Sequence, residues 1–230
     1  LLTKILDTAG QKGTGRWTVD ASMDFAMPVS LVAEAVHARI VSALVDDRYL
    51  TADALGEPPV GEIEGNRVEL LADLHSAAYA AKIVSYAQGF MLLSAASREH
   101  MWDLDMGLVA SLWRDGCIIR SQFLNDITSA YRSRPDLPNL LVAPYFVDAL
   151  TNTQDGLRRT VARAALAGIP TPAYSSALAF LDAFRTRRLP ANLLQAQRDY
   201  FGAHTFERTD KEGWFHAEWI QLRKEPIAKW

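Results

Sequence analysis

The sequence predicts an all-α fold, a large helical bundle-like domain with a long central helix and an irregular C-terminal tail. Apolar residues recur at helical spacing along most of the chain, whereas the alternating pattern of a half-buried strand is nearly absent. Clusters of proline and glycine separate the helical stretches. Hydrophobic residues make up 49% of the 230 residues and charged residues 22%, so the chain has enough apolar surface for a sizeable core.

The first expected helix begins near Pro28, because proline suits the first turn of a helix, and it runs to about residue 45. Four apolar residues within it recur every four positions and are expected to face the core: Val32, Val36, Ile40 and Leu44. The glycines and prolines of residues 56–65 indicate a loop after this helix.

The long central helix is expected over residues 67–100, which contain no proline and are rich in alanine, leucine, tyrosine and methionine. Gly89 weakens a helix relative to alanine, so we expect another helix to pack closely there. Further helices are expected in five stretches, at residues 104–113, 118–133, 144–167, 173–187 and 190–201. Residues 1–204 are therefore assigned to one helical domain and residues 205–230 to the tail.

Composition narrows the classes of function. The formal net charge of −3 gives no overall basic field, so neither nucleic acid nor an anionic membrane is an expected partner. No apolar stretch is long enough to span a bilayer. The single cysteine, Cys117, excludes an internal disulfide and favours a reducing compartment. Histidine, cysteine and acidic residues nowhere cluster at metal-ligand spacing, so no metal site is predicted.

Two features of the N-terminal part are candidates for anion binding. Residues 10–15 read Gly-Gln-Lys-Gly-Thr-Gly, and three glycines let the backbone approach a phosphate while Lys12, the Thr14 hydroxyl and main-chain N–H groups donate hydrogen bonds. The alternative is a flexible surface loop with an exposed lysine. Arg39 lies at the edge of an apolar helix face, where a guanidinium either extends to solvent or meets a buried anion.

A second candidate pair, Arg198 and His204, lies in residues 195–205. On a continuous helix these side chains would point in different directions, since six residues turn through about 600°. Gly202 suits a helix C-terminus, and a chain reversal there would bring His204 back towards Arg198, so that the two could share one anion. The alternative is a solvated arginine, with His204 capping the last carbonyl groups of the helix.

Four segments, taken in order, resemble the decarboxylating 6-phosphogluconate dehydrogenases. Residues 5–18 look like the start of that family's C-terminal domain, and residues 82–90 are similar to its long central helix. Residues 112–121 match the helix pair that follows. The most specific match is residues 189–205, which include the run Gln-Arg-Asp-Tyr-Phe-Gly-Ala-His. The resemblance covers nearly the whole chain.

The resemblance implies a cytoplasmic enzyme of the pentose phosphate pathway that oxidises 6-phosphogluconate with NADP and decarboxylates the 3-keto intermediate to ribulose 5-phosphate. It implies that Lys12, Thr14 and Arg39 bind the substrate phosphate, and that Arg198 and His204 reach substrate bound in the other subunit of a homodimer. A phosphate dianion removed from water needs several fixed cationic donors, and each charge-assisted hydrogen bond contributes about 1.5–3 kcal/mol.

The family's Rossmann domain binds most of the NADP and carries the catalytic lysine and glutamate. The 230-residue sequence contains no counterpart of the Rossmann domain, because no Gly-x-Gly-x-x-Gly motif follows a predicted strand. We therefore expect no catalytic residue in this chain and no turnover from it alone. One alternative is a free-standing, non-catalytic helical assembly module derived from the family. A short-chain β-hydroxyacid dehydrogenase is the other, and that family lacks the set of Lys12, Arg39 and Arg198. Residues 220–230 also depart from the glycine- and serine-rich tail of the 6-phosphogluconate dehydrogenases.

Overall fold

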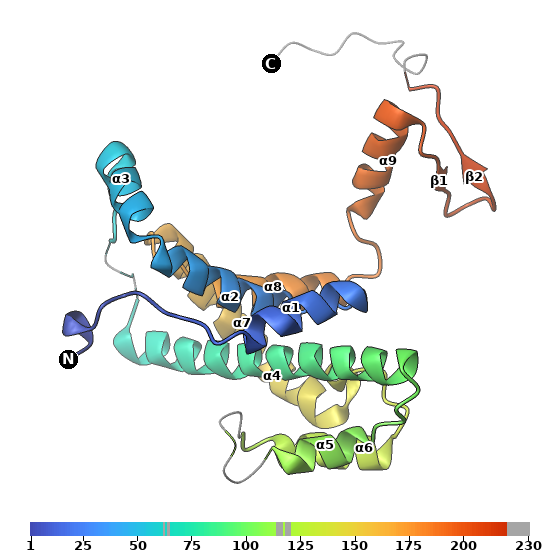
Figure 1. The fold of residues 1–230 in the computed structure, drawn as a ribbon, viewed down its shortest axis with the longest axis horizontal. Helices are drawn as coiled ribbons and strands as arrows, with labels where there is room; N and C mark the ends of the chain where they lie inside the picture. The colour runs from blue at the N-terminus through green and yellow to red at the C-terminus, as the bar shows by residue number, and fades with distance from the viewer. Residues whose placement is uncertain (62, 64, 114–116, 118–120, 220–230) are drawn as a thin grey trace. The chain divides into compact units, whose positions relative to one another are not determined.

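The structure is a computed structural model that describes residues 1–61, 63, 65–113, 117 and 121–219 (Figure 1). The chain divides into two compact units, Leu1–Asp182 and Ala183–Trp230. This division falls at a different place from the domain boundary predicted between residues 204 and 205. Helices dominate the described residues, as the sequence predicts, and the strands among these residues form one antiparallel pair.

The first unit is built from helices of very different length. In chain order they are α1 (Thr14–Asp24), α2 (Ser30–Ala43), α3 (Val45–Leu55), α4 (Arg67–Glu99), α5 (Met106–Leu112), α6 (Leu124–Ser133), α7 (Pro144–Leu166) and α8 (Pro172–Phe184). Two short 3-10 turns, η1 (Leu2–Lys4) and η2 (Leu140–Val142), complete this unit. Within the described residues, every helix is too short or too polar to cross a membrane.

Besides the last two residues of α8, the described part of the second unit contains one helix and one hairpin. Helix α9 (Ala191–Gly202) is followed by strands β1 (Phe206–Glu207) and β2 (Trp214–Phe215). The strands pair antiparallel, with Phe206 opposite Phe215. The tail predicted to be irregular therefore contains a short hairpin within its described part, while residues 220–230 lie outside the described residues.

Helix α4 is the centre of the first unit, and its bounds agree with the helix predicted over residues 67–100 (Figure 1). The Asn66 side chain accepts a hydrogen bond from the Val68 backbone N–H (2.8 Å) and so caps the start of α4. Helix α7 packs along α4, and side chains from α6, η2 and α7 fill the core with those of α4. The largest fully buried members of this core include Ile83, Phe90, Phe123, Ile127, Leu140, Phe146 and Leu157.

Helices α4 and α7 approach closely at Gly156. A Cβ atom added at Gly156 would lie 2.5 Å from the Ser76 Cβ and 3.2 Å from the Asp73 carbonyl oxygen. A Cβ added at Gly89 would meet none of the described residues within 4 Å. Within the described residues, the close helix packing expected at Gly89 is therefore not found, because a glycine permits a close approach without requiring one.

An ion-pair cluster joins the same two helices. Asp73 of α4 is buried, and its carboxylate accepts hydrogen bonds from the Arg159 Nη2 (2.6 Å) and from Arg163, both on α7. The hydrogen bond from Arg159 lowers the pKa of Asp73, and it outweighs burial, which acts in the opposite direction. The ionised form of Asp73 on α4 is thus stabilised by two arginines of α7.

A buried amide fixes α2 against α4. The Gln88 side chain is fully buried, and its Oε1 accepts a hydrogen bond from the Leu31 backbone N–H (3.1 Å). Its Nε2 donates to the Ser30 hydroxyl (3.0 Å). Because both partners lie in the first turn of α2, this amide places the helix that carries Arg39.

The helix predicted from Pro28 to about residue 45 is interrupted. α2 ends at Ala43, and Leu44 (φ −82°, ψ 61°) breaks the chain before α3. Ile40 and Leu44 are 43% and 47% exposed, so the end of the expected apolar stripe does not face the core. The spacing alone could not show this, because the prediction assumes that the helix continues in phase. Helix α1 was also not predicted.

Candidate functional site

The glycine-rich segment leads directly into a helix. Gly13 has a left-handed backbone (φ 98°) and is the N-cap of α1, so Thr14 is the first helical residue. Glycine adopts this backbone without steric cost, which explains its presence at the turn. The first N–H groups of a helix have no intrahelical partner and attract anions. Lys12 and Thr14 are both exposed beside this helix start.

Arg39 of α2 is attached to the same segment. Its Nε donates a hydrogen bond to the Gly10 carbonyl oxygen (2.9 Å), while other parts of the guanidinium face solvent. The Ala9 backbone N–H donates to the Ser42 hydroxyl (2.9 Å), one turn further along α2. The structure therefore places Arg39 beside the segment that contains Lys12.

Close packing of α1 on α2 supports this arrangement. A Cβ added at Gly15 would lie 2.7 Å from the Val36 Cγ2, so α1 begins in direct contact with α2. An ion pair between Arg48 of α3 and Asp7 (2.8 Å) attaches the residues that precede the glycine-rich segment to α3. Three of the five predicted binding residues thus belong to one surface of the first unit.

The other two predicted residues, Arg198 and His204, belong to the second unit. Both are exposed, and the Arg198 Nη1 donates a hydrogen bond to the Gln195 Oε1 (3.2 Å) within α9. α9 ends at Gly202, as expected, but the left-handed residue is Ala203 (φ 49°). What Gly202 provides is space, because a Cβ there would lie 2.7 Å from the His204 Nε2.

The sequence patterns missed Asp199, which organises the second unit. Its side chain is fully buried, and Oδ1 accepts hydrogen bonds from the Thr205 N–H (3.0 Å) and the His216 Nδ1 (2.9 Å). Oδ2 accepts from the Ala217 N–H (3.0 Å) and the Trp219 Nε1 (2.8 Å). The local sequence does not indicate the burial of Asp199, because a lone aspartate in a polar helix normally faces solvent.

The hydrogen bonds of Asp199 also shift the pKa values of Asp199 and His216. Burial alone would raise the pKa of Asp199, but the four hydrogen bonds outweigh it and lower that pKa well below its ordinary value. The bond to Asp199 raises the pKa of His216. The stabilisation from Asp199 is present above its ordinary pKa of 3.8 and is lost as the pH falls further. The contribution of protonated His216 is complete below pH 6.5 and is lost as the pH rises through its raised pKa.

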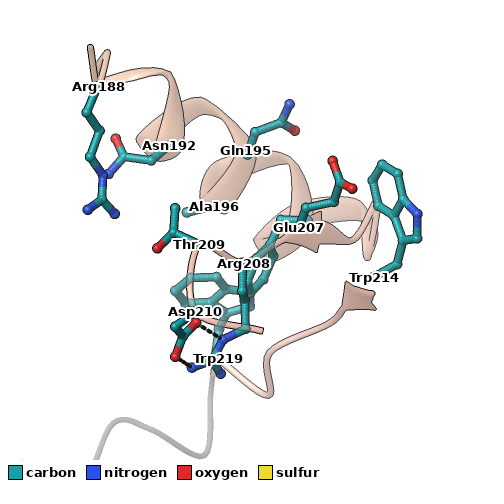
Figure 2. A pocket seen from close by; sticks show the side chains of 11 residues that line it. Arg188, Asn192, Gln195, Ala196, Glu207, Arg208, Thr209, Asp210, Trp214 and Trp219 are labelled. Atoms are coloured by element: carbon teal, nitrogen blue, oxygen red, sulfur yellow. Dashed lines mark hydrogen bonds and ion pairs between the residues drawn. The ribbon is translucent and has the colours of Figure 1, made fainter. Parts of the chain in front are cut away.

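A cavity of about 490 Å³ lies within the second unit, beside α9 and the hairpin (Figure 2). Gln195, the partner of Arg198, lines this cavity, and so do Trp214 and Trp219. Figure 2 shows Arg208 and Asp210 facing each other at its edge, joined by two hydrogen bonds of 2.8 and 2.7 Å. Its lining is mixed, with aromatic rings and paired charges.

The described residues lack both the side-chain cluster that a metal ion needs and the parallel sheet of a Rossmann site. Among these residues, no group of three or more His, Cys, Asp or Glu side chains could hold a metal ion. A Rossmann site for a dinucleotide needs a parallel sheet and a glycine-rich turn into a helix. The described sheet consists of the antiparallel pair β1 and β2, so it does not fit that cofactor.

The fold and site define a helical domain, built on one long helix, that presents cationic side chains beside a glycine-rich helix start. The family described as "6-phosphogluconate dehydrogenase, C-terminal domain" matches residues 1–219. This chain belongs to that family.

Individual relatives agree with this assignment. The chain is 56% identical over 207 residues to "6-phosphogluconate dehydrogenase, decarboxylating 2" of Saccharomyces cerevisiae, covering 90% of this chain and 42% of that protein. It is 48% identical to the "NADP(+)-dependent, decarboxylating" enzyme of Bacillus subtilis, covering 96% of this chain and 47% of the relative.

A solved structure shows the same fold. It is the Plasmodium falciparum 6-phosphogluconate dehydrogenase, described in its apo form and in complexes with its cofactor NADP+ and its substrate 6-phosphogluconate. The TM-score is 0.90 at 39% identity, and the match covers 95% of this chain and 47% of that one. The chain therefore spans about half the length of the relatives it matches.

Proposed function

We propose that this chain is the substrate-phosphate-binding and dimerisation half of an NADP-dependent, cytoplasmic oxidoreductase. The whole enzyme oxidatively decarboxylates 6-phosphogluconate to ribulose 5-phosphate and CO2 in the pentose phosphate pathway. Family membership supports the reaction, since the relatives are decarboxylating 6-phosphogluconate dehydrogenases. NADP would supply the hydride acceptor when bound, and we assign most of its binding to a Rossmann domain of the whole enzyme.

The observation that carries the proposal is the contact between Arg39 and the Gly10 carbonyl, at 2.9 Å. This contact fixes a guanidinium beside residue 10, in the segment that leads to the exposed Lys12 and to Thr14, the first residue of α1. A phosphate bound by this segment would receive the positive charges of Arg39 and Lys12, the Thr14 hydroxyl and the free N–H groups of the first turn. The site is therefore suited to the phosphate end of the sugar acid, and the oxidation chemistry lies elsewhere.

Arg198 and His204 are assigned to the same substrate from the opposite subunit of a homodimer. Both side chains are exposed on the second unit, as a contribution to a neighbouring subunit requires. A two-fold interface would then create two equivalent shared sites per dimer. The rival proposal is a free-standing, non-catalytic assembly module of the same family.

Charge removal in the full-length gene product that carries this chain tests the phosphate site. Lys12→Ala and Arg39→Ala should each raise the KM for 6-phosphogluconate about tenfold or more, since each removes one charge-assisted hydrogen bond. The KM for NADP should stay nearly constant. The kcat/KM for unphosphorylated gluconate should also change little, because that ligand has no phosphate to lose.

Two exposed cations of the first unit serve as matched controls. Lys4 precedes the glycine-rich segment, and Arg134 pairs with Asp136 (3.5 Å) after α6. Lys4→Ala and Arg134→Ala should leave the KM for 6-phosphogluconate unchanged. Equal losses with 6-phosphogluconate and gluconate would contradict the phosphate role. A full-length product with no dehydrogenase activity would favour the assembly module.

A further inference from the structure

Asp199 is the buried residue of a helix whose other residues face solvent or are half-buried. Its neighbours Arg198 and Tyr200 are exposed, while the Asp199 side chain is 0% exposed. Burying a carboxylate is costly unless hydrogen bonds replace the water that it loses. Four donors do so here, and they come from three places in the chain: residue 205, residues 216–217 and residue 219.

The residues that directly follow α9 form a strained turn. Ala203 (φ 49°) and Thr205 (φ 62°) both have left-handed backbones, and His204 lies between them. This backbone is unfavourable for any residue with a Cβ and most of all for a β-branched threonine. Such a turn persists only where neighbouring contacts compensate for its strain.

Asp199 supplies those contacts from both its main chain and its side chain. The Ala203 N–H donates to the Asp199 carbonyl oxygen (2.9 Å). The Thr205 N–H donates to the Asp199 Oδ1 (3.0 Å). One residue therefore fixes the backbone on each side of His204. The ring of His204 is placed in turn by an edge-on contact with Phe201, at 5.7 Å between centroids.

Arg198 is held differently. It lies inside α9, one residue before Asp199, and its guanidinium is bonded to Gln195 of the same helix (3.2 Å). Its position follows from the helix and does not need the turn after Gly202. The two predicted substrate contacts of the second unit thus differ in their dependence on Asp199.

We propose that Asp199 is a positioning residue for substrate binding, whose carboxylate holds the left-handed turn that presents His204. The inference rests on the proposed function, in which His204 contacts 6-phosphogluconate. His216 shares Oδ1 with the Thr205 N–H, and Ala217 and Trp219 donate to Oδ2, so the chain after the hairpin also contributes to the position of His204.

The test is a set of double-mutant cycles in the full-length gene product. Asp199→Asn keeps the shape of the side chain, but one of its two terminal atoms no longer accepts hydrogen bonds. It should raise the KM for 6-phosphogluconate by about tenfold, as His204→Ala does, with the KM for NADP unchanged. In a His204→Ala background the same change should add less than about twofold, because the two residues act through one contact. In an Arg198→Ala background it should keep its full effect.

Two further variants complete the design. Asp210→Asn removes a charge from an exposed ion pair in the same unit and should leave the KM for 6-phosphogluconate unchanged. Trp219→Phe removes one donor to Asp199 but keeps an aromatic ring, and it replaces Asp199→Asn should that protein not fold. It should raise the same KM by a smaller factor, and this rise too should disappear in the His204→Ala background.

Each outcome separates the inference from the proposed function. A lower melting temperature for Asp199→Asn with an unchanged KM would show a merely structural role and overturn the inference. So would an equal rise in KM with and without His204. If His204→Ala itself leaves the KM unchanged, the assignment of His204 to the substrate fails, and the inference fails with it.

Discussion

Gly202 shows how a missing side chain can set the position of a functional one. The His204 ring lies where a Cβ of residue 202 would point, with its Nε2 2.7 Å from that position. The ring is the far end of a flexible side chain, so it can move aside without disturbing the backbone. A methyl group at this point should therefore displace His204 while the fold is kept.

We expect Gly202→Ala to raise the KM for 6-phosphogluconate several-fold, up to about tenfold, because the displaced imidazole loses a charge-assisted contact with the substrate. The melting temperature should hardly change, since alanine is tolerated at the end of a helix. Steady-state kinetics and thermal denaturation of the full-length gene product measure both. Gly61→Ala, with no described residue within 4 Å of the added Cβ, is the control. A drop in stability with unchanged kinetics would contradict this account.

For individual residues, the sequence predicted the candidates but only part of their burial and hydrogen bonding. Lys12, Thr14 and Arg39 are assigned to the phosphate through the family resemblance, because a surface loop and a solvent-facing arginine explain the same local pattern equally well. The role of Asp199 could not be predicted. Its burial depends on donors 6–20 residues further along the chain, and no local pattern predicts which of several aspartates such donors surround.

Helices α4 and α7 show what periodicity can and cannot predict for an element. The bounds of α4 followed from an alanine-rich stretch without proline, and the core that it forms confirms its central place. The contact between the two helices did not follow, since close packing of an unspecified helix was expected at Gly89, whereas α7 approaches α4 closely at Gly156. A glycine in one helix carries no information about the helix opposite.

These two glycines give a matched test of the α4–α7 contact. Gly156→Ala forces a methyl group to 2.5 Å from the Ser76 Cβ, and we expect it to lower the free energy of unfolding by about 1–3 kcal/mol. Gly89→Ala meets none of the described residues and replaces a poor helix former, so it should raise the free energy of unfolding by about 0.5–1 kcal/mol. Thermal denaturation should thus give shifts of opposite sign. Stabilisation by both changes would mean that α7 does not approach α4 at this point.

For the whole molecule, the five predicted binding residues are divided between the two compact units. Lys12, Thr14 and Arg39 belong to Leu1–Asp182, whereas Arg198 and His204 belong to Ala183–Trp230. Sequence patterns could identify the family from the ordered segments of the chain, and the match over residues 1–219 confirms it. They cannot show from the residues alone which units combine into one site, because that depends on an interface and not on local spacing.

Sharing of the site between subunits is tested by mixing two inactive proteins. Full-length Arg39→Ala and Arg198→Ala variants, each nearly inactive at low 6-phosphogluconate, are co-expressed with different tags. If the two residues serve one site from opposite subunits, a mixed dimer has one doubly defective site and one intact site. Random pairing makes about half the dimers mixed, so about a quarter of wild-type sites should be recovered.

A site built within a single subunit predicts a different recovered activity in the same mixing experiment. If each subunit supplies both arginines to its own site, every site in every dimer keeps one defect and no activity returns. Double-tag purification isolates the mixed dimers and should raise the recovered fraction to about half of the sites, because each such dimer then holds one intact site. Gluconate turnover controls for damage to the oxidation chemistry, which neither substitution touches. Recovery near zero in purified mixed dimers would show that Arg198 acts within its own subunit, and the proposed dimer-shared site would be wrong.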